Sequence, residues 1–596
     1  MSDSSLSQGW IISRQWDMLF FIGTPLLSLA LLLTAARFFS SADIALFVLA
    51  FFAVGHHLPG FMRAYGEREL FQRYKARFIV APICITAFVG WSVFSGHLGF
   101  FIFLALWDMW HFFMQHYGFM RIYDVKRRKP RPFSARLDWW MTAIWFGYIV
   151  VASPHYLINF LERCHRYGFG LYTWIQPESI FTLRDILFYA AVGLSVVYVA
   201  NMFWERRQGI PIVWPKLAIS ITTFATVFYA YIVLEDIILG YAVTALAHDV
   251  QYFAIVWIYN RGVLKRSRQL GASFFRFLFK DGRFRLVLFY VALILTYGGI
   301  EAFARATHNY LFYDIVKVVI AASAFMHYYY DGFMWKVRKK EIRQNLVDDD
   351  GSGAETVAVR WSLRPWIEGM QDWLERMRLR RAEFAYGFET GKQVLYFGIP
   401  IYFLAWSDAT YSVDDVAAGQ YLEQLAPEVA KTHHDLGMSY LHQAFADQTP
   451  GRQALLDQAI GAHRRAIELD PEFAMAYTHL GIAYSLKKEY RQAVYYHKKA
   501  IEIAPRLPQA HYNLGVEYER LGRLAQAQVA YGRAVEFDPQ YARAYQSLAL
   551  IHRRLGHEAE AKKYHARAQE LAQTKQRRAL SQSAMPWATG TPVKGS

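Results

Sequence analysis

The sequence of 596 residues predicts an all-α protein, in which a polytopic transmembrane helical bundle of about ten or eleven helices precedes an α-solenoid. Two patterns lead to this prediction. Apolar segments of roughly 17 to 22 residues, long enough to cross about 30 Å of hydrocarbon, recur through residues 1–340. Beyond residue 428 they give way to a fixed 34-residue period, which is typical of stacked helix pairs.

The composition also favours a membrane protein. Hydrophobic residues make up 54% of the chain and aromatic residues 17%, a share that suits Trp and Tyr at membrane interfaces. The net charge of +16 comes largely from short loops between the apolar segments, so we expect no nucleic-acid partner. The two cysteines, Cys84 and Cys164, provide neither a disulfide framework nor a thiolate metal site.

The apolar segments place the expected helices. The first begins near Trp16 after a polar start, and its length predicts a span rather than a cleaved signal peptide. The ten segments lie near residues 16–36, 42–59, 78–96, 98–117, 138–154, 182–203, 212–233, 237–258, 285–300 and 313–333.

Basic loops predict the orientation of these helices. Lys and Arg crowd after the second, fourth, sixth, eighth and tenth segments, and the loops after the odd-numbered segments lack such clusters. By the positive-inside rule the even-numbered helices end in the cytoplasm, and the N-terminus lies there too. We therefore expect an integral protein of a bacterial inner membrane.

Residues 341–427 form a mixed linker. DDDGSG at 348 predicts a flexible acidic loop, and WIEGMQDWLERMRLRRAEF predicts an amphipathic helix along the membrane surface. The apolar segment 393–407, QVLYFGIPIYFLAWS, is short, so an eleventh span, a re-entrant piece and a buried helix remain open. The side of the membrane on which the C-terminal domain lies therefore stays open.

The 34-residue period is carried by glycines, prolines and small residues. It links Leu480-Gly481 to Leu514-Gly515, Pro471 to Pro505 and Pro539, Ala493 to Ala527 and Ala561, and Ala500 to Ala534 and Ala568. This pattern resembles the tetratricopeptide repeat (TPR) family over residues 428–573, with about ten residues near 443–456 inserted in the loop of the first repeat. The resemblance implies a TPR α-solenoid that docks a protein partner. Residues 574–596 are predicted to be a disordered tail.

Histidines lie within or at the ends of the even-numbered helices, where lipid contact would favour apolar residues. They occur in GHHLPGFMRAY at 55, WDMWHFFMQHYGFMRIYD at 107, AHDVQYFAIVWIYN at 247 and HYYYDGFMWK at 327. An ionisable group inside a membrane is costly unless it is paired or liganded, and neutral imidazole is the commonest side-chain metal ligand. We therefore predict one shared metal site, with the ligands His56, His57, His111, His116, His248 and His327.

Carboxylates accompany these histidines at short spacing, and the predicted catalytic partners are Asp331, Asp108 and Asp249. Asp331 follows His327 by four residues, which places both on one helix face. Such a carboxylate ligates the metal or fixes an imidazole tautomer. The alternatives are an interfacial role for each histidine and an ordinary ion pair of Asp331 with Lys336 or Arg338.

The set of histidines resembles that of the membrane di-iron oxygenases, which include fatty-acid desaturases and hydroxylases, and that of carotene-cleaving membrane dioxygenases. The resemblance implies bound iron, as one or two ions or another transition metal, and a lipid or isoprenoid substrate. The spacing departs from the desaturase boxes HxxxH and HxxHH. His111 and His116 are five residues apart, about 140° around a helix, so both members of the pair need not be ligands.

Three other functions remain open. A transporter would use the same residues as an ion path, although no inverted repeat or pair of broken short helices is evident. A lipid-modifying transferase would use a histidine as general base. A membrane-anchored TPR scaffold would only recruit partners, but ten spans with four polar stretches are more than an anchor requires.

Overall fold

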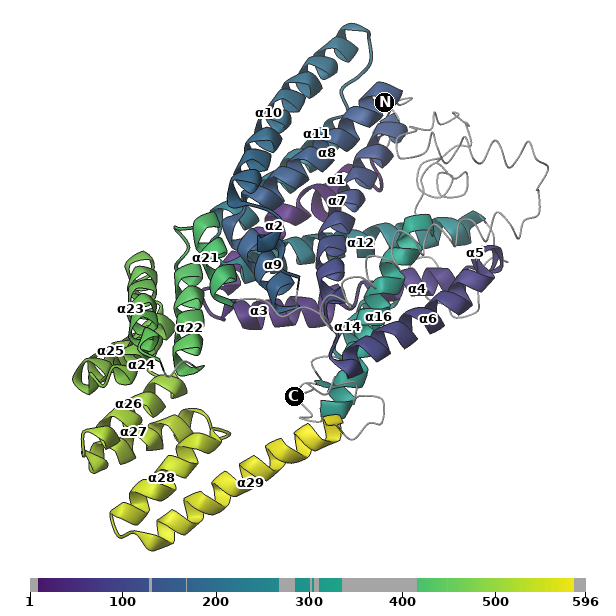
Figure 1. Ribbon diagram of the computed structural model, residues 1–596. Helices are drawn as coiled ribbons and strands as arrows, with labels where there is room; N and C mark the ends of the chain where they lie inside the picture. Colours follow the sequence, from purple (N-terminus) through teal and green to yellow (C-terminus); the bar gives the residue numbers. More distant parts are fainter. Residues whose placement is uncertain are drawn as a thin grey trace, which may run out of the picture. The chain divides into compact units, whose positions relative to one another are not determined.

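The computed structural model describes residues 9–127, 131–167, 169–266, 284–300, 303–304, 310–334, 415–446 and 449–583 (Figure 1). All regular elements in these ranges are helices, which confirms the all-α prediction. The chain divides into two compact units. The N-terminal unit comprises Met1–Tyr167 and Glu178–Thr410, and the C-terminal unit comprises Gly168–Pro177 and Tyr411–Ser596.

Each of the ten predicted apolar segments is helical in the N-terminal unit. In chain order the helices are α1 (Arg14–Asp17), η2 (Met18–Ile22), α2 (Thr24–Ala35), α3 (Ser41–Val48), η3 (Leu49–Ala53), α4 (His57–Gly66), α5 (Arg68–Arg73), α6 (Lys75–Ser95), α7 (Phe100–Arg127), α8 (Pro132–Ala152), α9 (Pro154–Arg166), α10 (Pro177–Arg207), α11 (Trp214–Phe228), η5 (Tyr229–Val233), α12 (Ile237–Arg266), α14 (Phe284–Gly298) and α16 (Tyr310–Met334). The short helices α5 and α9 were not predicted.

Turns of π-helix interrupt three of these segments, at η2, η3 and η5. In η3 the Val54 amide donates to the Leu49 carbonyl at 3.0 Å, an i to i+5 bond. Gly55 follows, where a Cβ would lie 2.4 Å from the Phe51 carbonyl oxygen and 2.7 Å from Ile294 Cγ2. The helix then restarts as α4, so His56 and His57 lie at a helix break.

Five helical segments in the described residues are long and apolar enough to cross a membrane, and two bent pairs raise the number to seven. The prediction of ten spans is therefore supported in part. Helices α7 and α12 have the length but not the apolar character, because they carry polar side chains, some of them from the predicted site. These are Asp108, His111, Gln115 and His116 in α7, and His248, Asp249 and Gln251 in α12.

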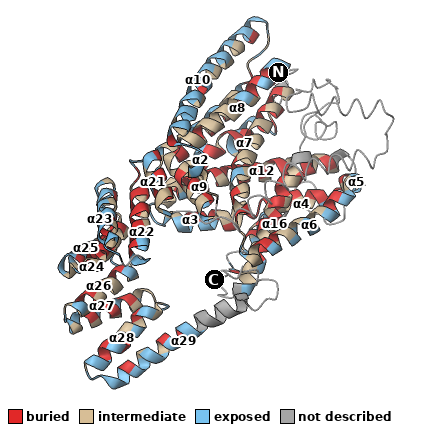
Figure 2. Cartoon of the chain, viewed as in Figure 1, coloured by how far each residue is buried: buried red, intermediate tan, exposed pale blue. Residues whose placement is uncertain are grey.

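The surface of α10 shows the opposite pattern. Most of this helix is exposed or half-buried, as the colours of Figure 2 show. The exposed apolar residues include Leu183, Ile186, Phe188, Val192, Val196 and Phe203. Exposed apolar residues in this number suit contact with lipid or with another apolar surface.

The C-terminal unit stacks helix pairs. Its elements are η4 (Leu171–Thr173), α21 (Asp415–Leu425), α22 (Ala430–Ala446), α23 (Gly451–Leu469), α24 (Ala474–Leu486), α25 (Tyr490–Ile503), α26 (Pro508–Arg520), α27 (Leu524–Phe537), α28 (Ala542–Arg554) and α29 (Glu558–Ser583). Consecutive helices pack against each other in four pairs, beginning with α22 and α23.

The recurring glycine of each repeat has a steric reason. A Cβ on Gly481 would lie 2.5 Å from the His497 ring, and one on Gly515 would lie 2.6 Å from the Tyr531 ring. In each case the ring comes from the second helix of the same pair. The first helix therefore needs glycine so that an aromatic ring can pack against its backbone.

The repeat boundaries differ from the prediction in three places. The two helices of the first repeat are 17 and 19 residues long, whereas those of the next repeat are 13 and 14 residues long. The extra residues of the first repeat therefore continue both helices. Helix α21 precedes residue 428, and α29 continues past 573 to Ser583. The predicted surface helix, segment 393–407 and residues 584–596 lie outside the described residues.

Candidate metal centre

Four helical segments of the N-terminal unit bring most of the predicted ligands together. Helix α16 packs against α4 and α7, and α12 packs against α4 (Figure 1). The predicted span 98–117 put His111 near the end of its helix. Helix α7 continues to Arg127, so His111 lies near its middle instead. The side chains come from the break before α4 (His56, His57), from α7 (His111), from α12 (His248, Asp249) and from α16 (His327, Asp331).

Three imidazole nitrogens and one carboxylate oxygen converge. His327 Nε2 lies 3.1 Å from His56 Nε2 and 3.3 Å from His111 Nε2. Asp331 Oδ2 lies 3.6 Å from His111 Nε2 and 3.7 Å from His327 Nε2. Ligands about 2.1 Å from one ion, at angles of about 90 to 120°, are separated by about 3.0 to 3.6 Å. His111, His327 and Asp331 therefore have the spacing of a first ligand shell, and His56 Nε2 lies next to it through its contact with His327. We call these four residues the first ligand group.

The carboxylate of this group is held in a defined orientation. The Tyr252 hydroxyl donates to Asp331 Oδ1 at 3.1 Å, so Oδ2 faces the histidines. Gly60 leaves the room for this arrangement, because a Cβ there would lie 3.0 Å from the Tyr252 hydroxyl oxygen and 3.5 Å from His327 Nδ1. Partners of this kind orient metal ligands in proteins.

A second ligand group lies on the other side of the His56 ring. His56, His248 and Asp249 each offer an atom within 4.8 Å of the others. His56 Nδ1 lies 2.9 Å from Asp249 Oδ1. All three residues are at most 4% exposed. Both nitrogens of His248 and the Oδ2 atom of Asp249 lack a hydrogen-bond partner in the described part of the chain.

Asp108 lies beside the second ligand group but is already hydrogen-bonded. Its two oxygens accept bonds of 2.7 Å from the hydroxyls of Tyr241 and Tyr328. Asp108 lines a small pocket together with His56, His248 and Asp249. The structure thus places Asp108 in the pocket wall and outside both ligand groups.

The other two predicted ligands have different neighbours. His57 Nδ1 lies 2.8 Å from Ser323 Oγ, and its ring packs on His327 with centroids 5.0 Å apart. His116 is buried elsewhere, with its ring 5.4 Å from that of Phe224 in α11. The five-residue spacing turns His116 away from the face of α7 that carries His111.

Sequence reasoning missed several supporting residues. Gln115 donates to the His248 carbonyl at 3.0 Å and ties α7 to α12. Ser323 and Gly60 contact the histidines as described above. Ser323 lies four residues before His327, so the spacing places it on the same helix face. Gly60 carries no comparable signal, because its role depends on the approach of α12 and α16.

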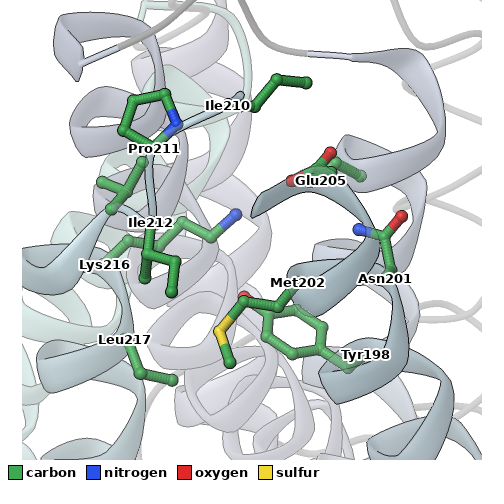
Figure 3. A pocket seen from close by; sticks show the side chains of 11 residues that line it. Tyr198, Asn201, Met202, Glu205, Ile210, Pro211, Ile212, Lys216 and Leu217 are labelled. Atoms are coloured by element: carbon green, nitrogen blue, oxygen red, sulfur yellow. The ribbon is translucent and has the colours of Figure 1, made fainter. Parts of the chain in front are cut away.

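A second small pocket lies between α10 and α11 (Figure 3). Its lining includes Lys216, whose Nζ lies 2.8 Å from Asp138 Oδ1 and 3.6 Å from Asp124 Oδ1. Arg121 Nη1 lies 2.9 Å from an oxygen of each of these carboxylates. The charges of two cations and two carboxylates thus balance one another. Lys216 belongs to this ion network, so it is not a free anion-binding site.

Comparison with known proteins identifies the C-terminal repeats. Residues 508–541 and 542–575 each match a tetratricopeptide repeat model. A solved structure titled "Crystal structure of MamA" is 28% identical, covers 27% of this chain and 89% of its own, and has a TM-score of 0.24. "MamA 41-end from Desulfovibrio magneticus RS-1" is 21% identical over 26% of this chain and 85% of its own, with a TM-score of 0.23. No curated protein matches. Residues 508–575 are therefore tetratricopeptide repeats, as the sequence period predicted.

Proposed function

We propose that this protein is an integral membrane metalloenzyme of the oxygenase, hydroxylase or desaturase type, which binds iron in its N-terminal unit and acts on a lipid or isoprenoid. The observation that carries the proposal is the convergence of His111, His327 and Asp331, with His56 in contact with His327. The TPR repeats serve as a docking domain for a protein partner, as stacked repeats with extended surfaces do.

The distribution of polarity supports membrane embedding. The N-terminal unit buries histidines and carboxylates and exposes apolar residues on α10 and on other helices. A soluble protein does the reverse, because buried ionisable groups are costly and exposed apolar faces associate. The basic loops orient the helices with the N-terminus in the cytoplasm of a bacterial cell.

The donor set supports a transition metal. Imidazole nitrogens suit iron, zinc, copper and nickel, and a mixed histidine and carboxylate set with open positions is typical of non-haem iron. Iron bound there would supply the activation of dioxygen. The protein's own contribution is to hold the Asp331 carboxylate through Tyr252 and to surround the ligands with buried aromatic rings, which exclude water.

The apolar surroundings of the site support a lipophilic substrate. Aromatic and aliphatic side chains lie next to the histidines, including Phe112 and Met109 in the wall of the pocket beside Asp108. A hydrocarbon chain is stabilised by such a lining, and the hydroxyls of Tyr241 and Thr244 in the same wall suit a polar end group.

Metal analysis of the detergent-purified full chain tests the proposal. Wild-type protein produced with iron available should retain iron, and the double variant His111→Ala/His327→Ala should lose it. His116→Ala is the matched control, since it removes a buried histidine of α7 outside both ligand groups. Oxygen-dependent changes in the lipid extract of producing cells, absent for the double variant, should accompany the bound iron. A folded wild type that takes up no transition metal would contradict the proposal.

The second candidate is a membrane-anchored TPR scaffold. The repeat matches at residues 508–575 favour it, because such repeats bind proteins without any chemistry. If the protein is only a scaffold, the double variant should keep the full cellular function and capture the same partners as the wild type. If it is an enzyme, the double variant should still capture the partners but lose the cellular function.

A further inference from the structure

His56 lies between the two ligand groups, and its two ring nitrogens face different sides. Nε2 is 3.1 Å from His327 Nε2 in the first group. Nδ1 is 2.9 Å from Asp249 Oδ1 in the second. The ring itself is 3% exposed, and its centroid is 4.5 Å from that of His327 and 5.3 Å from that of His248. One imidazole therefore contacts both sets of donors.

The second group has the properties of a binding site in its own right. His248 is 4% exposed and lines the pocket beside Asp108, and neither of its ring nitrogens has a hydrogen-bond partner in the described residues. A buried imidazole without partners loses its hydration and gains nothing in return. Asp249 is 1% exposed, and its Oδ2 is likewise unpartnered. A cation between these residues would take one nitrogen of His248 and one oxygen of Asp249 as ligands.

The contact between His56 and Asp249 is compatible with the same conclusion. A carboxylate that only orients a metal-bound imidazole accepts a directed hydrogen bond from its second N–H. Here Nδ1 and Oδ1 are 2.9 Å apart, a separation that suits such a bond and equally suits two ligands of one ion. The separation matches that of two ligands at about 90° on one ion, which is about 3.0 Å.

We propose that the centre holds two metal ions, one on each side of His56, and that the His56 imidazole bridges them. The first ion is bound by His56 Nε2, His111, His327 and Asp331, and the second by His56 Nδ1, His248 and Asp249. The His56 ring loses its remaining N–H proton to water when the second ion binds. Two ions on opposite nitrogens of one imidazole lie about 6 Å apart. This inference rests on the proposed function, which supplies the first ion.

Reloading of the full-length protein tests the bridge. Chelator-treated wild type in detergent is titrated anaerobically with Fe(II) and, in parallel, with Cu(II) as a magnetic probe. Wild type should bind two ions, and His248→Ala should bind one. Asp249→Asn should also bind one ion. Because it keeps the side-chain volume, it provides a second test if His248→Ala fails to fold. His116→Ala should bind two, since it lies outside both groups. In the Cu(II) form, the magnetic coupling of two ions through the ring should weaken the resonance signal of wild type relative to His248→Ala.

The outcomes separate the two proposals. A single ion in wild type, kept with unchanged affinity in His248→Ala and Asp249→Asn, overturns the bridge and leaves the proposed function standing. A single ion whose affinity falls in Asp249→Asn also overturns it, because Asp249 then acts only by positioning His56. A wild type that binds no ion overturns both proposals. Two uncoupled ions overturn the bridging role of His56 alone.

Discussion

The Tyr252 hydroxyl donates a 3.1 Å hydrogen bond to Asp331 Oδ1, and this bond turns Oδ2 towards His111 and His327. Tyr252→Phe removes the bond while it keeps the ring. We expect the variant to bind iron about 10 to 100 times more weakly than the wild type, the usual cost of losing a residue that orients a ligand. Competition with a chelator of known affinity measures the change.

Tyr123→Phe is the matched control for this variant. The Tyr123 hydroxyl donates to Asp17 Oδ2 at 3.0 Å, so the control also removes a buried bond between tyrosine and aspartate, but one outside the ligand groups. Iron affinity should be unchanged in the control. Equal losses in both variants would show that the effect is one of general stability rather than of ligand orientation.

Gly60 is the position at which one added methyl group should disturb the centre. In Gly60→Ala the new Cβ would lie 3.0 Å from the Tyr252 hydroxyl oxygen and 3.5 Å from His327 Nδ1. The first contact is tight enough to displace the Tyr252 hydroxyl from Asp331, whereas the second is an ordinary van der Waals contact, so we expect iron binding to weaken about 10-fold. Gly118→Ala, in α7, is the control, because its Cβ meets nothing within 4 Å. That change should leave binding intact and stabilise the helix by up to about 1 kcal/mol. Unimpaired binding in Gly60→Ala would contradict the prediction.

Gly481→Ala should destabilise the repeats. Its Cβ would lie 2.5 Å from the His497 ring, which is fully buried and has little room to move. Overpacking of this kind costs about 1 to 3 kcal/mol. Gly532→Ala in α27, where the Cβ meets nothing within 4 Å, should be neutral or stabilising. Thermal unfolding of the full chain, with proteolysis of the C-terminal unit as readout, separates the two variants. Equal protease resistance would show that the first repeat helix tolerates a side chain at this position.

Much of the fold follows from periodicity in the sequence. Apolar length located every helical segment that the prediction placed among the described residues, and the 34-residue interval located the repeats. The helix breaks were not predictable in the same way. The π-turn before His56 depends on Gly55 packing against Phe51 and Ile294, and Ile294 belongs to a helix far along the chain. Long-range contacts of this kind leave no local pattern.

The candidate site was likewise predictable from the sequence only in part. Burial of ionisable groups in apolar helices identified His56, His111, His248 and His327, which the structure brings together. It also identified His116, which the structure places beside Phe224, because helical phase rather than residue type decides which groups meet. The separation into two ligand groups on either side of one ring needs three-dimensional coordinates.

Buried histidines should make the repeats sensitive to acid. His463, His479 and His497 lie inside the C-terminal unit, and burial lowers the pKa of each, to about 4 for His479 and about 3 for His497. Their ordinary pKa is 6.5, so below that pH the unfolded chain binds protons that the folded chain does not. The contribution of each histidine to stability is therefore fully present above pH 6.5. It falls as the pH drops towards the pKa of that histidine in the folded chain, by up to about 1.4 kcal/mol per pH unit.

His497→Phe removes one such group, so the unfolding temperature of the C-terminal unit should depend less steeply on pH between 6 and 4 than in the wild type. The exposed His565, which hydrogen-bonds Gln569 on the surface of α29, provides the control as His565→Phe, and its slope should match the wild type. A wild-type unfolding temperature that stays constant from pH 7 to 4 would show that these rings take up protons without unfolding.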